Sequence, residues 1–263
     1  MLDDLKLWVR LLATAARGRM QYRVDLFFQI LAMALTTAAD FLMVWVLISA
    51  CGPTIGWTLA EASLLYGVVL VPFGIVQFIN AGFERFHDLV RRGQVDLLLL
   101  RPRPLLVLVA GEDLPVRQIG RLAQAVAVFA WALWMIPLSM GDCLLLGWAM
   151  AWGVVLYLSF DVIRAASAFW TVEGSEMWNV LTYGGSMAAI WPAEAYRPVL
   201  RTVLLTIVPV AAVGWLPVAQ VLGKDHGFPA WVPWLAPTSG LVLSGLGLWL
   251  WTIGLRRYAS SGS

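Results

Sequence analysis

Residues 26–49 read LFFQILAMALTTAADFLMVWVLIS, and this stretch decides the fold class. It is 24 residues long, and Asp40 is its one charged residue. A helix needs about 20 mostly apolar residues to cross a bilayer, because the hydrocarbon core is about 30 Å thick. We therefore predict that residues 26–49 form a transmembrane helix.

The rest of the chain has the same character. Of its 263 residues, 60% are hydrophobic and 13% are charged, and the mean hydropathy is +0.79. Soluble domains are about 45–50% apolar and about 25% charged. We expect an all-α polytopic membrane protein whose single transmembrane domain covers residues 1–263. Its six predicted transmembrane helices are residues 26–49, 63–83, 122–138, 145–168, 202–222 and 234–255.

The N-terminal segment, residues 1–25, is predicted to form an interfacial amphipathic helix. Charged residues recur along one stripe of this helix, at Asp3, Lys6, Arg10 and Arg17. Apolar residues such as Trp8 and Leu12 share another stripe, which is typical of helices that lie in the membrane interface. The first residues, Met-Leu-Asp-Asp, lack the positive charge of a signal peptide, so we expect this segment to be retained.

Basic residues predict the orientation, because loops rich in lysine and arginine stay cytoplasmic. With both termini inside, the inner face collects five basic residues from the N-terminal helix and seven arginines between Glu84 and Arg121. Three more, Arg164, Arg197 and Arg201, are expected around the fourth connection, and two at the C-terminus. Lys224 is then the one basic residue on the outer face. We predict that both termini are cytoplasmic.

The cytoplasmic loop, residues 84–121, is the most informative segment. Its first part, Glu84–Arg92, is predicted to continue as a charged amphipathic helix, with Gly93 as a left-handed C-cap. The sequence that follows is more ordered than a topology signal requires: Arg92-Gly93-Gln94-Val95-Asp96-Leu97-Leu98-Leu99-Leu100-Arg101-Pro102. We interpret it as an interfacial helix presented to a partner protein. A positive loop that only sets the topology is the alternative.

Three ionisable residues fall within predicted spans, where charge is costly unless it faces protein, water or an opposite charge. Asp40 belongs to the first span, and Asp161 and Arg164 belong to the fourth. Asp161 and Arg164 are one helical turn apart and can neutralise each other. These residues either line a substrate path or serve as a local charge pair or a contact with lipid headgroups.

Prolines and small residues mark further features of the spans. Pro72 and Pro209 each remove a backbone hydrogen bond, so they predict kinks, either static or acting as hinges. Gly240, Ser244 and Gly247 share one face of the sixth span, which favours close helix packing. That contact lies either within the bundle or between subunits.

Several functional classes are excluded or unsupported. A net charge of +2, spread over short loops, does not indicate nucleic-acid binding. A phosphate-binding loop needs a Gly-Lys-Ser/Thr ending, but Gly223-Lys224 is followed by Asp225. His87 and His226 are predicted on opposite faces, and no Gly-x-Ser-x-Gly motif occurs, so we expect no enzyme and no bound cofactor or metal. Cys51 and Cys143, both predicted at the outer face, are either free or bridged.

The order of these features resembles the ABC-2 type permeases of bacterial ABC transporters. The resemblance rests on the interfacial helix, the six spans and two motifs. The first motif is the loop with Arg92-Gly93, Asp96 and Leu99-Leu100-Arg101-Pro102, and the second is the tail Leu255-Arg256-Arg257-Tyr258. The region around Pro209 and Trp215-Leu216-Pro217 is also similar.

The resemblance implies a permease subunit of an ATP-driven exporter in the bacterial inner membrane. Such a subunit pairs with a second permease, identical or a sibling, and binds two cytoplasmic ATPase subunits that use ATP and Mg²⁺. It also implies that residues of the segment Glu84–Pro102 couple the permease to those ATPases. In this sequence they are Glu84, Arg85, His87, Arg91, Arg92, Gly93, Asp96, Arg101 and Pro102.

The apolar and aromatic spans suggest an amphiphilic or hydrophobic substrate, either a small drug-like cation or a lipid. Two alternatives remain open. A gradient-driven secondary transporter or channel would use Asp40 or Asp161 as an ion site, although no inverted repeat or pair of broken helices supports it. A membrane scaffold would neither transport a substrate nor associate with an ATPase.

Overall fold

The computed structural model describes Thr14 and residues 23–111, 115–171 and 178–258. These residues form helices and no strand, as an all-α protein requires. The predicted interfacial helix of residues 1–25 lies outside them, except for Thr14 and the residues from Arg23 onward.

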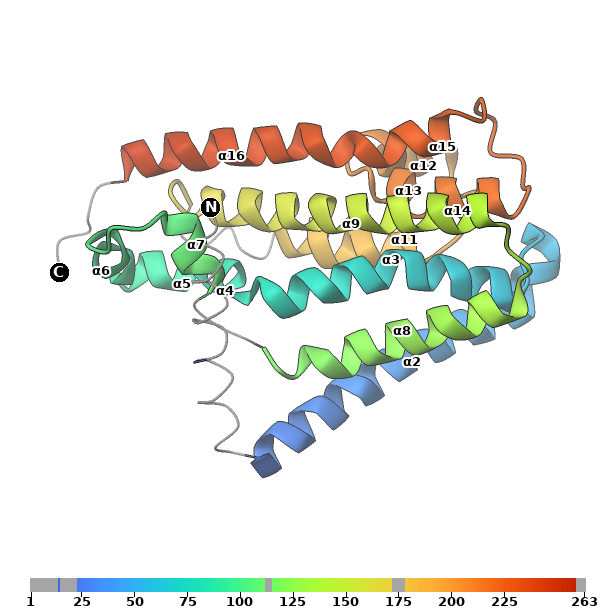
Figure 1. Cartoon of the computed structure of the whole chain (residues 1–263), viewed down its shortest axis with the longest axis horizontal. Coiled ribbons are helices and arrows are strands. Elements are labelled where there is room, and N and C mark those ends of the chain that lie inside the picture. Colours follow the sequence, from blue (N-terminus) through green and yellow to red (C-terminus); the bar gives the residue numbers. More distant parts are fainter. Residues whose placement is uncertain (1–13, 15–22, 112–114, 172–177, 259–263) are drawn as a thin grey trace.

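Long helices run side by side along the longest axis of the molecule (Figure 1). They are α2 (Arg23–Ile55), α3 (Leu59–Ile79), α8 (Gln118–Met135), α9 (Met140–Ser167) and α16 (Gly240–Arg257). Short helices complete the described chain: α4 (Ala81–Glu84), α5 (Phe86–Arg91), α6 (Gln94–Leu99), α7 (Leu105–Ala110), η1 (Val180–Gly184), α11 (Gly185–Ala189), η2 (Ala193–Ala195), α12 (Pro198–Thr206), α13 (Val210–Val213), α14 (Trp215–Val221), α15 (Val232–Leu235) and η3 (Ala236–Ser239). Helices α4 to α7 gather at one end of the bundle and α12 to α15 at the other (Figure 1).

Four segments of the described chain are long and apolar enough to cross a membrane, and a bent pair adds a fifth. The four are Arg23–Gly52, Leu59–Ile79, Met140–Ser167 and Val232–Arg257. They confirm the polytopic all-α class. The predicted third span corresponds to α8, which has 18 residues and carries Arg121 and Gln124 in its first half, and it is not among the four. The count of six therefore stays a prediction.

Capping boxes fix the outer starts of α3 and α9. The hydroxyl of Thr58 accepts from the amide of Glu61, and the Glu61 carboxylate accepts from the amide of Thr58 at 2.7 Å. Ser139 and Asp142 make the same reciprocal pair at the start of α9. Each pair satisfies backbone donors that the first helical turn leaves without partners.

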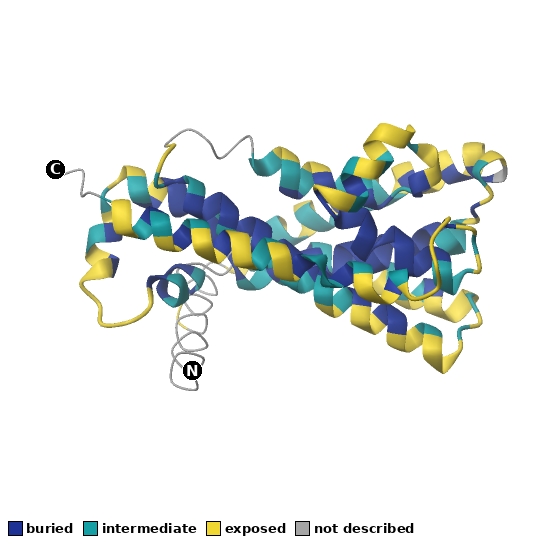
Figure 2. Cartoon of the chain, turned by 90° about the horizontal axis from the view of Figure 1, so that it is seen from above, coloured by how far each residue is buried: buried dark blue, intermediate teal, exposed yellow. Residues whose placement is uncertain are grey.

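Helix α3 lies at the centre of the bundle, and 83% of its most apolar 18-residue stretch is buried. Buried residues line the interior of the bundle and exposed ones its outside (Figure 2). Aromatic contacts join it to its neighbours: Phe73 packs edge-on against Tyr157 of α9 at 5.1 Å, and Tyr66 against Phe41 of α2 at 5.2 Å. In α2 only 11% of the most apolar 18-residue stretch is buried, so α2 lies at the edge of the bundle.

The small-residue face of the last helix packs within the chain. A Cβ on Gly240 would lie 3.2 Å from the amide nitrogen of Leu156, and one on Gly247 would lie 3.4 Å from the carbonyl oxygen of Ser159. The hydroxyls of Ser159 and Ser244 are 2.7 Å apart. Small side chains therefore let α16 approach α9 closely, which settles the contact left open by the sequence.

The predicted fifth span, residues 202–222, is not one straight helix. Helix α12 and the segment Val210–Val221 meet at an angle of 74°, with Pro209 at the break. Proline has no amide hydrogen and cannot continue the helical ladder, so the predicted kink at Pro209 is confirmed. Pro72, in contrast, lies inside an unbroken α3.

The break also places Arg201 at the same end of the bundle as Lys224, which was predicted on the opposite face. Its guanidinium lies 4.6 Å from the ring of Trp215 and donates to the carbonyl oxygen of His226 at 3.4 Å. His226 belongs to the same outer loop as Lys224, which pairs with Glu61 in the first turn of α3. The expectation that Arg201 and Lys224 lie on opposite faces is wrong, because it assumed a single straight crossing over residues 202–222.

Candidate functional site

The segment predicted as a cytoplasmic loop folds into α4, α5, α6 and α7 and packs against the ends of α9 and α16. Its buried side chains are Phe83, Phe86, Leu89, Val95, Leu98, Leu105, Leu108 and Val109. They form one apolar cluster with Ala165 and Ala166 of α9 and with Trp251 of α16. Phe86 lies 5.0 Å from Trp251, ring to ring. We call residues 84–102 the coupling segment, and this cluster anchors it to two long helices.

The predicted helix Glu84–Arg92 is divided in two. Arg85 has φ −91° and ψ 0°, which ends α4 and starts α5. The predicted left-handed cap is confirmed, since Gly93 has φ +65°. A residue with a Cβ would be strained at that φ, so glycine permits the turn from α5 into α6.

The coupling segment exposes arginines and leucines together. Its exposed basic side chains are Arg85, Arg91, Arg92 and Arg101. Leu100 is 81% exposed and Leu97 66%, next to exposed Pro102. A hollow of about 240 Å³ is lined by Arg85, Asp88, Leu89, Arg92 and Gln94. This mixed basic and apolar surface is typical of a protein interface.

Two predicted coupling residues face the protein instead. Glu84 is partly buried and accepts from the Tyr183 hydroxyl at 3.2 Å. His87 is buried, and its Nε2 lies 3.4 Å from the hydroxyl of Ser167. Burial, and after it the charge of Arg164, lowers the pKa of His87 below its ordinary value. These side chains join the segment to the bundle and cannot contact a partner directly.

The loop motif and the tail motif meet in the structure. The pKa of Tyr258 is raised by burial and then by Asp96, whose carboxylate acts on the Tyr258 hydroxyl. The Tyr258 ring packs edge-on against Phe169 at 5.8 Å, and Phe169 packs against Trp251 at 5.3 Å. Leu255 and Tyr258 pack against the apolar cluster that contains Val95 and Leu98, so packing connects α6 to the tail that follows α16, and the charge of Asp96 acts on Tyr258 there.

Asp161 and Arg164 form a buried ion pair at 2.9 Å, with side chains 3% and 1% exposed. Asn80 donates to the second oxygen of Asp161 at 3.3 Å, and Arg164 donates to Asn179 at 3.1 Å. Both oxygens of Asp161 and both terminal nitrogens of Arg164 have partners, although the buried Nε of Arg164 has none among the described residues, which favours the local charge pair over a substrate path. Asp40 is not part of this group; the charge that acts on it is that of Arg121 on α8.

Sequence reasoning missed a group of polar residues next to the ion pair. The Tyr183 hydroxyl lies 2.8 Å from the side-chain oxygen of Gln77 and 3.2 Å from a carboxylate oxygen of Glu84, and its one proton can be donated to either acceptor. Arg121 lies 5.7 Å from the rings of both Tyr183 and Phe73. Gln77, near the C-terminal end of an apolar span, could have predicted this group from the sequence, because a polar side chain there needs a partner within the protein.

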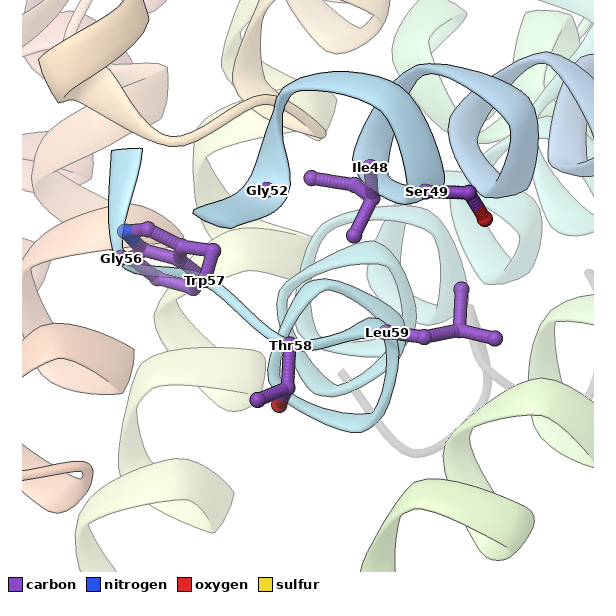
Figure 3. Close-up of a pocket in the computed structure, with 7 residues that line it drawn as sticks. All are labelled: Ile48, Ser49, Gly52, Gly56, Trp57, Thr58 and Leu59. Atoms are coloured by element: carbon purple, nitrogen blue, oxygen red, sulfur yellow. The ribbon is translucent and has the colours of Figure 1, made fainter. Parts of the chain in front are cut away.

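The outer end is held by Lys224. Its ammonium group lies 3.1 Å from the Glu61 carboxylate, donates to the carbonyl of Gly56 at 2.6 Å, and lies 4.8 Å from the Trp57 ring. Beside it, a hollow of about 390 Å³ opens between the end of α2 and the start of α3 (Figure 3). Figure 3 shows Ile48 and Ser49 on its α2 side and Thr58 and Leu59 on its α3 side.

Cys51 and Cys143 are free and exposed. Among the described residues, no group of three or more histidine, cysteine, aspartate and glutamate side chains is placed to hold a metal ion.

A family model described as ABC-2 family transporter protein matches residues 34–262. The match includes both the coupling segment and the tail Leu255–Tyr258. Comparisons with curated proteins and with solved structures found no match.

Proposed function

Because the chain belongs to the ABC-2 family of transporter membrane proteins, and is thus a multi-pass membrane component of an ABC transporter, we propose that it is the permease of an ATP-driven exporter. In this proposal it lies in the bacterial inner membrane and pairs with a second permease, identical or a sibling. Two cytoplasmic ATPase subunits bind the pair. They bind ATP and Mg²⁺, whereas this chain binds no cofactor and catalyses no reaction.

The observation that carries the proposal is the two-sided structure of the coupling segment. One side is an apolar cluster that contains Phe86, Leu98 and Trp251 and joins the segment to α9 and α16. The other side exposes Arg91, Arg92 and Leu100. A surface that binds an ATPase and is packed firmly on two long helices can transmit movement to them.

The second permease and the substrate path are proposed at the apolar outside of the bundle. Helix α2 exposes Phe27, Leu35 and Val46, each more than 60% accessible. Such a face fits either lipid or another apolar helix, and the path would lie between the two permeases. An amphiphilic or hydrophobic substrate suits walls of this kind. Asp40, partly buried on the same helix, is the ionisable residue we keep as a path candidate.

Co-purification with an ATPase subunit tests the proposal. We expect the full-length protein, extracted from its native membrane, to retain an ATPase. The paired substitution Arg91→Glu and Arg92→Glu should release it, because both side chains are exposed on the coupling segment. Arg117→Glu is the control, since Arg117 is exposed but lies outside that segment. Equal ATPase retention by all three proteins would contradict the role of the coupling segment.

A second test concerns coupling without loss of binding. Asp96→Asn removes the charge that acts on Tyr258. We expect this variant to keep the ATPase bound but to transport less substrate per ATP hydrolysed. Normal coupling would exclude this role for Asp96.

The gradient-driven alternative makes a different prediction. It requires transport by the purified chain alone, in liposomes under an ion gradient. The structure does not favour Asp161 as its ion site, because Arg164 and Asn80 occupy both carboxylate oxygens. Gradient-driven flux without an ATPase would support the alternative and contradict the exporter.

A further inference from the structure

Tyr183 is the residue at which the coupling segment and the central helix α3 are joined, and it lies two residues before a glycine that faces the break at Pro209. Its hydroxyl lies within hydrogen-bonding distance of Gln77 on α3, at 2.8 Å, and of Glu84 at the start of the coupling segment, at 3.2 Å. Both partners are acceptor oxygens, so the single hydroxyl proton is shared between Gln77 and Glu84 and keeps both side chains within reach of Tyr183.

The ring of Tyr183 also contacts two neighbouring helices. Phe73 of α3 packs edge-on against it at 5.3 Å, and Arg121 of α8 lies 5.7 Å from its centre. Four elements, α3, α4, α8 and η1, therefore meet at this one side chain.

The backbone at Tyr183 departs from regular α-helical hydrogen bonding. Tyr183 belongs to η1, a π-helical turn that leads directly into α11. π-helical turns interrupt the regular hydrogen-bond pattern and occur frequently at functional sites.

Gly185, two residues after Tyr183, faces the break between α12 and α13. A Cβ on Gly185 would lie 3.6 Å from Val208 and 3.7 Å from Val210, on either side of Pro209. Contiguous contacts therefore lead from Glu84 through Tyr183 and Gly185 to the break between α12 and α13.

We propose that Tyr183 is a positioning residue that transmits displacement of the coupling segment to the break at Pro209. The proposal rests on the proposed function, because it assumes that an ATPase moves the coupling segment. Its structural part, the bridge between Glu84 and η1, does not need the ATPase and can be tested alone.

The test compares Tyr183→Phe with Tyr157→Phe. Both substitutions remove one hydroxyl from a ring that packs against Phe73, at 5.3 Å and 5.1 Å, and only the Tyr183 hydroxyl bridges α3 and α4 in the described chain. In the protein alone, hydrogen exchange should rise about fivefold in residues 81–91 and 180–189 of Tyr183→Phe, the factor expected for one lost hydrogen bond. Tyr157→Phe should leave both segments unchanged. Equal exchange in the two variants would overturn the bridge.

A double substitution shows whether Glu84 and Tyr183 act together. If they do, Glu84→Ala added to Tyr183→Phe should cause little further exchange, because the contact is already lost. Additive effects of the two substitutions would exclude a shared contact and overturn the bridge.

The second arm uses the complex with its ATPase, with and without ATP and vanadate. In the native complex, nucleotide should change exchange in residues 84–102 and also in residues 198–213. In Tyr183→Phe the first change should persist and the second should be lost. Persistence of both changes would overturn transmission through Tyr183. A native complex in which nucleotide changes neither segment would instead contradict the proposed function.

Discussion

The ammonium group of Lys224 lies 3.1 Å from the carboxylate of Glu61 and joins the loop after α14 to the first turn of α3. Glu61 also caps that turn through the amide of Thr58. One carboxylate therefore fixes the start of the central helix and the loop that follows the bent element. Since α3 lies at the centre of the bundle, this contact ties the outer loop to the core.

Lys224→Met should loosen the outer end. The substitution removes the ion pair, the bond to the Gly56 carbonyl and the contact with the Trp57 ring. The lysine side chain is 18% exposed, so solvent screens the ion pair and we expect a loss of about 1 kcal/mol in total. Thermal unfolding in detergent, followed by tryptophan fluorescence, measures it. Arg197→Met, an exposed residue, is the control, and equal stability of both variants would count against the contact.

Asp161→Asn should be strongly destabilising, by about 3–5 kcal/mol, because it leaves the buried Arg164 charge without its partner. Replacing both residues, as Asp161→Leu with Arg164→Met, should restore most of the loss, because neither charge then remains buried. Denaturant unfolding of the three proteins provides the comparison. A double variant less stable than the single one would show that the pair itself is stabilising.

Acidification should destabilise the coupling segment. Burial lowers the pKa of His87, so the folded protein holds this residue neutral, whereas the unfolded chain takes up a proton near the ordinary value of 6.5. The unfolded state thus binds more protons than the folded state below that pH. The free energy of unfolding therefore falls as the pH drops through 6.5. Hydrogen exchange of residues 86–91 between pH 7.5 and 5.5 measures it, with the rates corrected for intrinsic pH dependence. His87→Gln should flatten the pH dependence, and an unchanged dependence would assign it to another group.

Gly120→Ala should separate α8 from α2. A Cβ at this position would lie 2.6 Å from the carbonyl oxygen of Ile30 and 3.1 Å from the amide nitrogen of Ala34. Both contacts are backbone atoms and cannot rotate away, so we expect a loss of about 1–3 kcal/mol. Gly147→Ala is the matched control, because nothing lies within 4 Å of a Cβ there. It should stabilise α9 by about 0.5–1 kcal/mol. Thermal unfolding separates the two, and similar stabilities would contradict the close packing.

The sequence by itself determined the class of the protein and several local features of its chain. Long apolar stretches such as residues 26–49 need no tertiary information, because the thickness of the bilayer sets the length of a helix that crosses it. The same local logic correctly predicted Gly93 as a left-handed cap and the kink at Pro209, since both depend on the φ and hydrogen-bonding capacity of one residue.

Only the tertiary structure decided where charges and hydroxyls go. Arg201 was predicted on the cytoplasmic face but lies by His226, because the 74° bend redirects the chain after Arg201. Tyr183 meets Glu84 across 99 positions of sequence, and Asp161 meets Asn80 across 81. Periodicity and composition report the environment of a helix along its own length, whereas these contacts depend on how separate helices pack. For that reason the sequence identified a coupling segment, and the folded chain identified what it is joined to.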